Sequence, residues 1–468
     1  MTPDDTRHLH EFLKLTDAER LGEGDVIAGA NTLAAMAISL ANIQRPGSGL
    51  IDRGGRRISV GTSLMISGSL SSSLVSERVL TGLAACQSNL ASRLDRMDST
   101  TWPSAFREDP ADEMDDRIFQ QLCQSRTPPA TITGREADSL SGRILQTSLP
   151  VEFRDLQERP VVFLTCGTPA RLAGQLERSH LGRPFVHLGV AGPADLERFG
   201  TDCLALMEGR LALPGGDEVI GGTVVVTDRN GALDEAVQGG SLAAKWASNL
   251  LWLVDGKAGP ELGDFNGSET AIPIEGIEGA YTAAMGTAWG RRINGWSDGP
   301  VTLEVDFAEA QARWIDFLKS NEKDFPGIAG ALRNLYATLI FGFHQMFKAA
   351  GVPTGFTWHH GQVEALAVFL VHRMVNARAV MMRSAEIAKM RRVQAGILGR
   401  LVDGPQDLRD ISRRFKNHNS GQCLVALHDL EMAGKVERGG DGWRLARPFD
   451  PEECNAWEAT LDLQADHM

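Results

Sequence analysis

The stretch that decides the fold is Ile58 to Leu74, which reads ISVGTSLMISGSLSSSL. Its apolar first part, Ile58 to Ser67, predicts a short buried strand, and Gly68 to Ser73 predicts a loop of small residues. From Leu74 to about Leu94 the apolar residues recur at helical spacing. A strand, a Gly/Ser-rich loop and a helix in this order form the setting in which a phosphate-binding loop occurs.

The residues that give a phosphate loop its chemistry are missing from this setting. With Gly68 as the first glycine of the pattern GxxxxGK[ST], Ser73 replaces the second glycine and Leu74 replaces the lysine, while Val75 stands where the hydroxyl that holds magnesium is needed. The first cationic side chain after the loop is Arg78, already inside the predicted helix. We therefore expect a degenerate phosphate loop, made of Gly68, Ser71, Ser72 and Ser73.

The acidic strand end that an NTPase needs is also missing from the two clearest following strands. The strands at 161–164 and 184–188 run into Cys166-Gly167 and Gly189, without a carboxylate at either end. Three interpretations of the Ser-rich stretch follow, in decreasing order of support: a plain turn, a loop that binds an anion weakly through its amides, and an intact ATPase. We expect no catalytic residues, no metal site and no cofactor, with ATP and magnesium disfavoured.

Further apolar runs extend the predicted sheet. A helix is expected at 169–180, and strands at 223–226 (TVVV) and 250–254 (LLWLV) complete an α/β core with a mainly parallel sheet. Helical periodicity then dominates at 308–319, 328–347 and 361–393.

Four segments in order carry a resemblance to a known family. They are the helix Ala28 to Leu40, the strand end Ser63 to Gly68, the TPARLA element at Thr168 to Ala173, and the helical region Leu332 to Ala377. In these the chain resembles the YfjI-like proteins, a prokaryotic group encoded in prophages, plasmids and genomic islands and often related to primase-helicase genes. The resemblance implies a RecA-like P-loop core followed by helices and a winged-helix tail.

The carboxy-terminal region predicts a small domain of its own. Helical patterns at 391–401, 407–415 and 420–433 precede two short strands around a Gly-rich turn at 435–445, which is the order of a winged helix. In such a motif the second helix of the helix-turn-helix presents its N-terminal residues to bases, and basic neighbours hold phosphates. The residues expected to contact DNA are Arg413, Arg414, Lys416, Asn417, His418, Asn419, Ser420, Gln422, Arg438 and Arg444.

The distribution of charge supports this expectation. The whole chain carries a formal net charge of −13, which argues against a basic surface over the whole protein. Residues 371–448 hold fifteen Lys and Arg against eight Asp and Glu, a net charge of +7, so the remainder carries −20. A basic end on an acidic body suits a phosphate backbone, while the alternative is a winged helix used for protein contacts alone.

Length and composition predict several domains. The 468 residues, 43% of them hydrophobic, divide into an N-terminal helical segment (1–50), an α/β core (51–300) with a loop-rich insertion (95–150), a helical region (301–390), a winged helix (391–450) and a tail (451–468). Six cysteines without a CxxC pair and a charged N-terminus without a signal peptide predict a cytoplasmic protein without a membrane partner.

These patterns together predict a function. The leading hypothesis is an accessory or scaffold protein of a mobile genetic element or an anti-phage system, which binds double-stranded DNA through its C-terminal domain and has protein partners or forms a homo-oligomer. The alternatives are an ATP-dependent helicase or translocase of plasmid or phage replication, and a scaffold subunit that makes only protein contacts.

Overall fold

The fold was described from a computed structural model of the chain. The described residues are 2–447 without 45–46, 53–54, 89–161, 167–171, 173–175, 177–182, 214–218, 240–245, 257–273, 295–301, 306–307, 352–359 and 415–419. The expected insertion at 95–150, most of the expected helix at 169–180 and the tail at 451–468 lie outside them.

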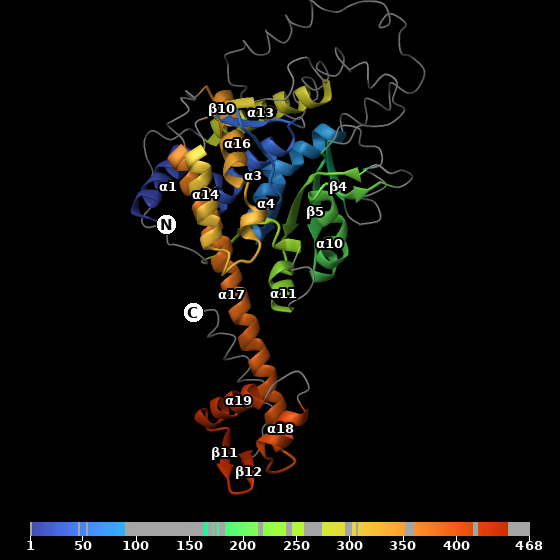
Figure 1. Ribbon diagram of the computed structural model, residues 1–468, viewed down its shortest axis with the longest axis vertical. Coiled ribbons are helices and arrows are strands. Elements are labelled where there is room, and N and C mark those ends of the chain that lie inside the picture. The colour runs from blue at the N-terminus through green and yellow to red at the C-terminus, as the bar shows by residue number, and fades with distance from the viewer. Residues whose placement is uncertain are drawn as a thin grey trace, which may run out of the picture. The chain divides into compact units, whose positions relative to one another are not determined.

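A five-stranded, fully parallel sheet forms the centre of the protein (Figure 1). Its strands lie in the order β4-β5-β8-β3-β9, and Leu64 of β3 pairs with Val225 of the central β8 on one side and with Leu251 of β9 on the other. The predicted α/β class with a mainly parallel sheet is thereby confirmed. The strands are β3 (Leu64–Ser67), β4 (Phe163–Cys166), β5 (Phe185–Val190), β8 (Thr223–Asp228) and β9 (Leu251–Val254).

The predicted single strand at 58–67 is wrong, because the stretch belongs to two sheets. Its first part is β2 (Arg57–Ser59), which pairs antiparallel with β1 (Gly49–Asp52), and β1 pairs parallel with β10 (Thr302–Val305). Gly61 between the two sheets has φ +132°, a conformation that breaks a strand. The Asn42 side chain holds the break, since it donates to the Thr62 carbonyl at 2.9 Å and accepts from the Thr62 amide at 3.1 Å.

A buried helix, α3 (Val26–Asn42), supports the sheet from the N-terminal part of the chain. Fifteen of its side chains are buried, and it packs against α2, α4, α13 and α16. Asp25 begins the helix, because its carboxylate accepts from the amides of Ile27 at 2.7 Å and Ala28 at 3.1 Å. Before it come α1 (Pro3–Leu15) and the short α2 (Ala18–Leu21).

Among the helices that follow the sheet along the chain, α13 and α16 pack on α3. A Cβ atom at Gly342 of α16 would lie 2.0 Å from the Ala37 carbonyl oxygen of α3, so only glycine permits this approach of the two helices. Phe343 of α16 meets Phe12 of α1 edge to face, with 5.0 Å between the ring centroids. These helices are α13 (Ile274–Asn294), α14 (Ala308–Ser320), α15 (Ile328–Ala331) and α16 (Leu335–Ala349).

The helix α10 (Pro193–Met207) packs on two inner strands of the sheet, β5 and β8 (Figure 1). Trp246 locks this helix in place, because its indole N–H donates to the Leu196 carbonyl at 2.7 Å and its ring lies where a Cβ at Gly200 would be. The remaining elements here are a small hairpin of β6 (Leu211–Ala212) and β7 (Val219–Ile220), and α11 (Ala232–Gly239).

The chain divides into two compact units, and the long helix α17 (His360–Leu401) contributes to both. Unit 1 holds 1–236 and 240–378, so the predicted N-terminal segment, core and most of the helical region share one body. The helices expected separately at 361–393 and 391–401 are continuous in α17. One stretch of α17 is long and apolar enough to cross a membrane, but 67% of that stretch is buried inside the protein, as in a core helix.

Unit 2 holds 237–239 and 379–468, and its described part is a small helical module with a hairpin. The end of α17 is followed by α18 (Leu408–Arg414), α19 (Ser420–Met432) and the antiparallel pair β11 (Val436–Gly439) and β12 (Gly442–Leu445), close to the predicted ranges. Gln406 forms a bridge to Trp443 and so ties the segment before α18 to the hairpin. Its core comprises Val393, Ile397, Leu398, Leu401, Ile411, Cys423, Ala426, Leu427, Leu430, Val436 and Trp443.

The contact between α3 and α16 yields a direct test. We predict that Gly342→Ala lowers the free energy of unfolding by about 2 to 4 kcal/mol, because the added methyl group forces the two helix backbones apart. Gly286→Ala in α13 is the matched control, since a Cβ there meets no atom within 4 Å and should stabilise the helix by about 0.5 to 1 kcal/mol. Urea denaturation followed by circular dichroism measures both, and equal effects would contradict this account of the packing.

Candidate functional site

The corner between β3 and the helix after it is the place where a phosphate loop would lie. The predicted loop at Gly68 to Ser73 is wrong, because α4 (Ser69–Val75) begins directly after Gly68 and continues as a π-helical turn, η1 (Ser76–Leu80). Gly68 alone connects strand and helix, with φ +119°. A phosphate loop wraps several successive amides around its ligand. A one-residue connection offers no such cradle.

The amides at the start of α4 are already bound to an acidic side chain of the protein. Asp255, which directly follows β9, accepts from the Leu70 amide at 3.0 Å and from the Ser71 amide at 3.1 Å. A carboxylate is favoured there by the positive end of the helix dipole. A Cβ atom on Gly68 would lie 2.3 Å from the Asp255 carboxylate, so the glycine is needed for this approach. The position that an external phosphate would take is therefore filled by Asp255.

Two serines of the expected loop, Ser71 and Ser72, are directed into the protein. Ser72 is fully buried, and its hydroxyl lies 3.0 Å from each of the carbonyl oxygens of Ile66 and Asp228. Ser71 is also fully buried and accepts from the Asn31 amide group at 3.0 Å. Ser73 is exposed on the first turns of the helix. The two buried hydroxyls thus bind neighbouring elements of the core and are closed to a ligand.

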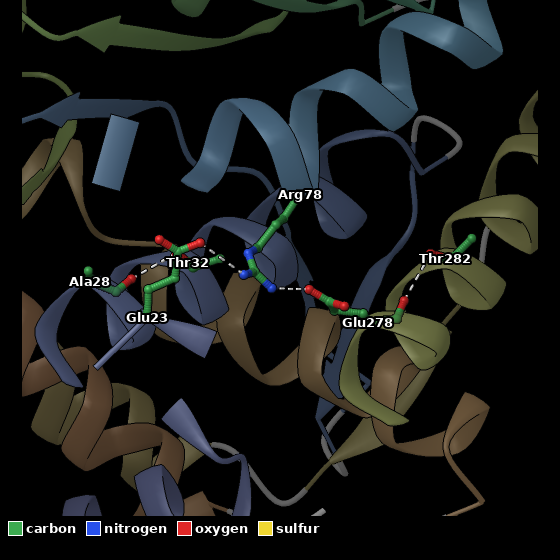
Figure 2. A network of polar contacts seen from close by, with 6 residues as sticks. All are labelled: Glu23, Ala28, Thr32, Arg78, Glu278 and Thr282. Atoms are coloured by element: carbon green, nitrogen blue, oxygen red, sulfur yellow. Dashed lines mark hydrogen bonds and ion pairs between the residues drawn. The ribbon is translucent and has the colours of Figure 1, made fainter. Parts of the chain in front are cut away.

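The first cationic side chain of this helix, Arg78, is committed to two carboxylates. Figure 2 shows its guanidinium between Glu278 of α13, in direct contact, and Glu23, whose carboxylate lies 3.5 Å away. The Arg78 side chain is only 19% exposed. It joins η1 to α13 and to the turn before α3. It therefore cannot replace the missing phosphate-loop lysine without breaking these ion pairs.

Two carboxylates do end strands of the sheet, and sequence reasoning missed both. One of them, Asp228, is fully buried at the end of β8, the strand next to β5, and the other is Asp255 after β9. Asp228 accepts from the Ser67 hydroxyl at 3.0 Å and from the amides of Ala232 and Leu233 at 2.9 Å, so it holds the start of α11. The sequence TDRNG at 227–231, an acidic residue before a turn, was the available signal. The Asp228 carboxylate is engaged in structure.

A histidine lies next to this strand end. The His187 Nε2 atom of β5 is 2.9 Å from the Thr227 hydroxyl of β8. Burial lowers the pKa of His187 to about 4, and the positive charge of Arg229 adds to the effect. His187 is therefore neutral at neutral pH, where its role is a hydrogen bond between adjacent strands.

Unit 2 presents several of the predicted DNA-contacting residues on its surface. Arg413 is exposed on α18 and lies 4.0 Å from Asp410, while Arg444 of β12 pairs with Glu437 across the hairpin at 2.6 Å. Arg438 of β11 is exposed and lies over the Trp443 ring, 6.0 Å from its centroid. Ser420 begins α19, with Gln422 half-buried. The side chain of Arg414 and all of Lys416, Asn417, His418 and Asn419 lie outside the described residues.

The exposed face of α19 carries two apolar side chains, and the helix has no lysine or arginine. Val425 is 51% exposed and Met432 is 89% exposed, and His428 and Asp429 lie on the same face. This helix was expected to provide base contacts, and an apolar side chain can contact a thymine methyl group. The positive charge of unit 2 thus lies on α17, α18 and the hairpin rather than on α19.

Comparison with known proteins gives this chain no relative: no protein-family model matches it, and no curated protein is similar to it at a significant level.

The contact between Asp255 and α4 leads to a stability prediction. Asp255→Ala should lower the free energy of unfolding by about 1 to 3 kcal/mol, because the amides of Leu70 and Ser71 lose their acceptor in a partly buried site. Glu197→Ala on the exposed side of α10 serves as the control and should change stability by less than about 0.5 kcal/mol. Urea denaturation distinguishes the two, and equal effects would remove Asp255 from its capping role.

The lowered pKa of His187 predicts a pH dependence of stability. An unfolded histidine binds a proton below its ordinary pKa of 6.5, whereas folded His187 does so only near pH 4. The free energy of unfolding is thus unaffected by His187 above pH 6.5. It falls by about 3 kcal/mol as the pH drops toward 4, because the unfolded chain binds the proton first. Denaturation at several pH values should show a shallower loss for His187→Gln than for the unchanged protein. Parallel curves would contradict the assignment.

Proposed function

We propose that this protein is a DNA-binding accessory or scaffold protein of a mobile genetic element or an anti-phage system. Its α/β core is a P-loop-type domain without nucleotide chemistry, and unit 2 binds double-stranded DNA. The observation that carries the proposal is the combination of a start of α4 occupied by Asp255 with a separate compact module whose residues 379–448 carry thirteen Lys and Arg against eight Asp and Glu, a net charge of +5.

Strand order supports a RecA-like core. The strand before the phosphate corner, β3, is the first of the sheet along the chain and lies between the last, β9, and the fourth, β8. The complete order, numbered along the chain, is 5-1-4-3-2, which is that of RecA-like domains and differs from the 3-2-1-4-5-6 order of dinucleotide-binding folds. The resemblance to YfjI-like proteins agrees with this assignment and suggests the mobile-element context.

The arrangement of unit 2 supports a winged helix. Three helical segments followed by a two-stranded hairpin share one core, and the bridge from Gln406 to Trp443 adds the short third pairing found beside many wings. Exposed arginines on α18 and the hairpin would hold phosphates, with the start of α19 toward the bases. The acidic remainder of the chain, with a charge of −20, would limit indiscriminate binding.

A scaffold that makes only protein contacts is the second candidate. The exposed Val425 and Met432 on α19 favour it, since apolar side chains on a surface helix are typical of protein interfaces. A helicase or translocase is the third, and its phosphate site would need residues other than those at the β3 corner. Sustained ATP turnover in the presence of DNA, abolished by a substitution at Gly68, would favour that enzyme.

Duplex binding and its salt dependence test the proposal. We expect Arg413→Gln with Arg414→Gln to weaken binding of a labelled duplex about tenfold and to reduce the slope of log K against log salt by about 2, because two phosphate contacts are lost.

The matched control removes two exposed arginines from unit 1. Arg7→Gln with Arg198→Gln changes the net charge by the same amount, on side chains that are 64% and 57% exposed. This pair should leave both the affinity and the slope unchanged. Equal losses in the two double variants would mean that overall charge, and not a contact made by unit 2, causes the effect. If the unchanged protein binds no duplex, the proposal is overturned in favour of the protein scaffold.

A further inference from the structure

The exposed face of α19 is the least explained surface of unit 2. His428 on this face lies edge-on to the Trp443 ring, 5.7 Å between centroids, and 3.2 Å from Glu431, and Arg438 of the hairpin lies over the same ring. Val425 and Met432 flank His428 one turn away on either side. A partner that fits this face would offer both apolar and acidic side chains.

The end of the chain has this composition. Residues 448–468 contain six acidic residues and no lysine or arginine, together with two large aromatic residues and two leucines. The acidic residues are Asp450, Glu452, Glu453, Glu458, Asp462 and Asp466, and the apolar ones are Phe449, Trp457, Leu461 and Leu463. Its charge of −6 is opposite to the net charge of +5 on residues 379–448, and its apolar residues could pack against those exposed on α19.

The segment also starts at the right place. Lys435 comes three residues after the last residue of α19, Met432, and its amide donates to the Leu430 carbonyl at 2.9 Å. The Ala446 amide, at the end of β12, donates to the Lys435 carbonyl at 3.0 Å. The chain therefore leaves the hairpin beside the C-terminal end of α19, three residues in sequence from the exposed Met432. Twenty-one residues then remain, and α19, with thirteen, is about 20 Å long.

We propose that residues 449–468 bind the exposed face of α19 and compete with DNA for unit 2. This inference rests on the proposed function and adds its regulation. The acidic side chains would meet Arg438 and its cationic neighbours, and Trp457 and Leu461 would cover Val425 and Met432. Because α19 is the helix proposed to enter the major groove, a tail on this face excludes the duplex.

Two measurements on the same proteins test this inference. The first compares duplex binding by the full chain and by a chain ending at Pro448, and we expect removal of the tail to tighten binding about tenfold. Val425→Ser with Met432→Ser in the full chain should also tighten it, because the tail loses its apolar anchors. Glu197→Gln with Glu309→Gln, on the exposed surface of unit 1, is the control for a loss of negative charge and should have no effect.

The second measurement follows the tail itself, without DNA. A fluorescently labelled peptide of residues 449–468 should bind the chain that ends at Pro448, and a peptide with Trp457→Ala and Leu461→Ala should not. Absence of peptide binding, or equal duplex affinity with and without the tail, overturns the inference. Peptide binding by a protein that binds no duplex would support the docking of the tail and overturn the DNA proposal alone. Concentration-dependent dimers of the shortened chain, lost with Val425→Ser and Met432→Ser, together with no peptide binding, would assign the face to a second copy instead.

Discussion

The contact between Asp255 and the first turn of α4 governs what the core can do. In a phosphate-binding domain the positive end of this helix is left free for a ligand, and the protein provides a lysine to complete the site. Here the carboxylate at the end of the neighbouring strand takes the ligand's place. Gly68 makes this possible, because a side chain at that position would collide with Asp255.

The polar side chains around this contact also bind groups of the protein itself. Arg373 of α17 donates to the carbonyls of Val254 and Gly256 on both sides of Asp255, and Asn31 of α3 joins Ser71 to Val254. These polar groups connect α3 and α17 to the end of β9 and to the start of α4. Such buried polar contacts specify one arrangement of the elements, since each donor left without an acceptor would cost free energy.

The two units therefore differ in the chemistry that they offer. In unit 1 the charged groups at the sheet end are used internally, as Arg78 between Glu23 and Glu278 illustrates. In unit 2 the cations lie on exposed side chains, and the helix α19 between them presents apolar residues. The polar groups at the end of the sheet in unit 1 thus bind one another, whereas unit 2 exposes charged and apolar side chains to solvent.

Local sequence patterns were sufficient for the parallel α/β sheet, for the helix at 308–319 and for α18, α19 and the hairpin of unit 2. Each of these depends on apolar periodicity and turn residues within a short window. The sequence also predicted the absence of the phosphate-loop lysine after Gly68, because the spacing of that pattern is fixed. The single helix expected at 328–347 is wrong, because α15 ends at Ala331 and α16 begins at Leu335, and the helices expected at 361–393 and 391–401 are one helix, α17.

Two predictions for the stretch 58–73 were wrong. The strand at 58–67 is divided between two sheets, and Ser69 to Ser73 are helical. Both depend on partners far away, namely β1 and β10 for the first half and Asp255 for the helix start. Sequence alone thus determined that the second glycine, the lysine and the Ser/Thr of the phosphate-loop pattern are missing after Gly68. Only the tertiary structure decided what replaces it, because Asp255 lies 187 positions after Gly68 and reaches α4 only when β9 pairs beside β3.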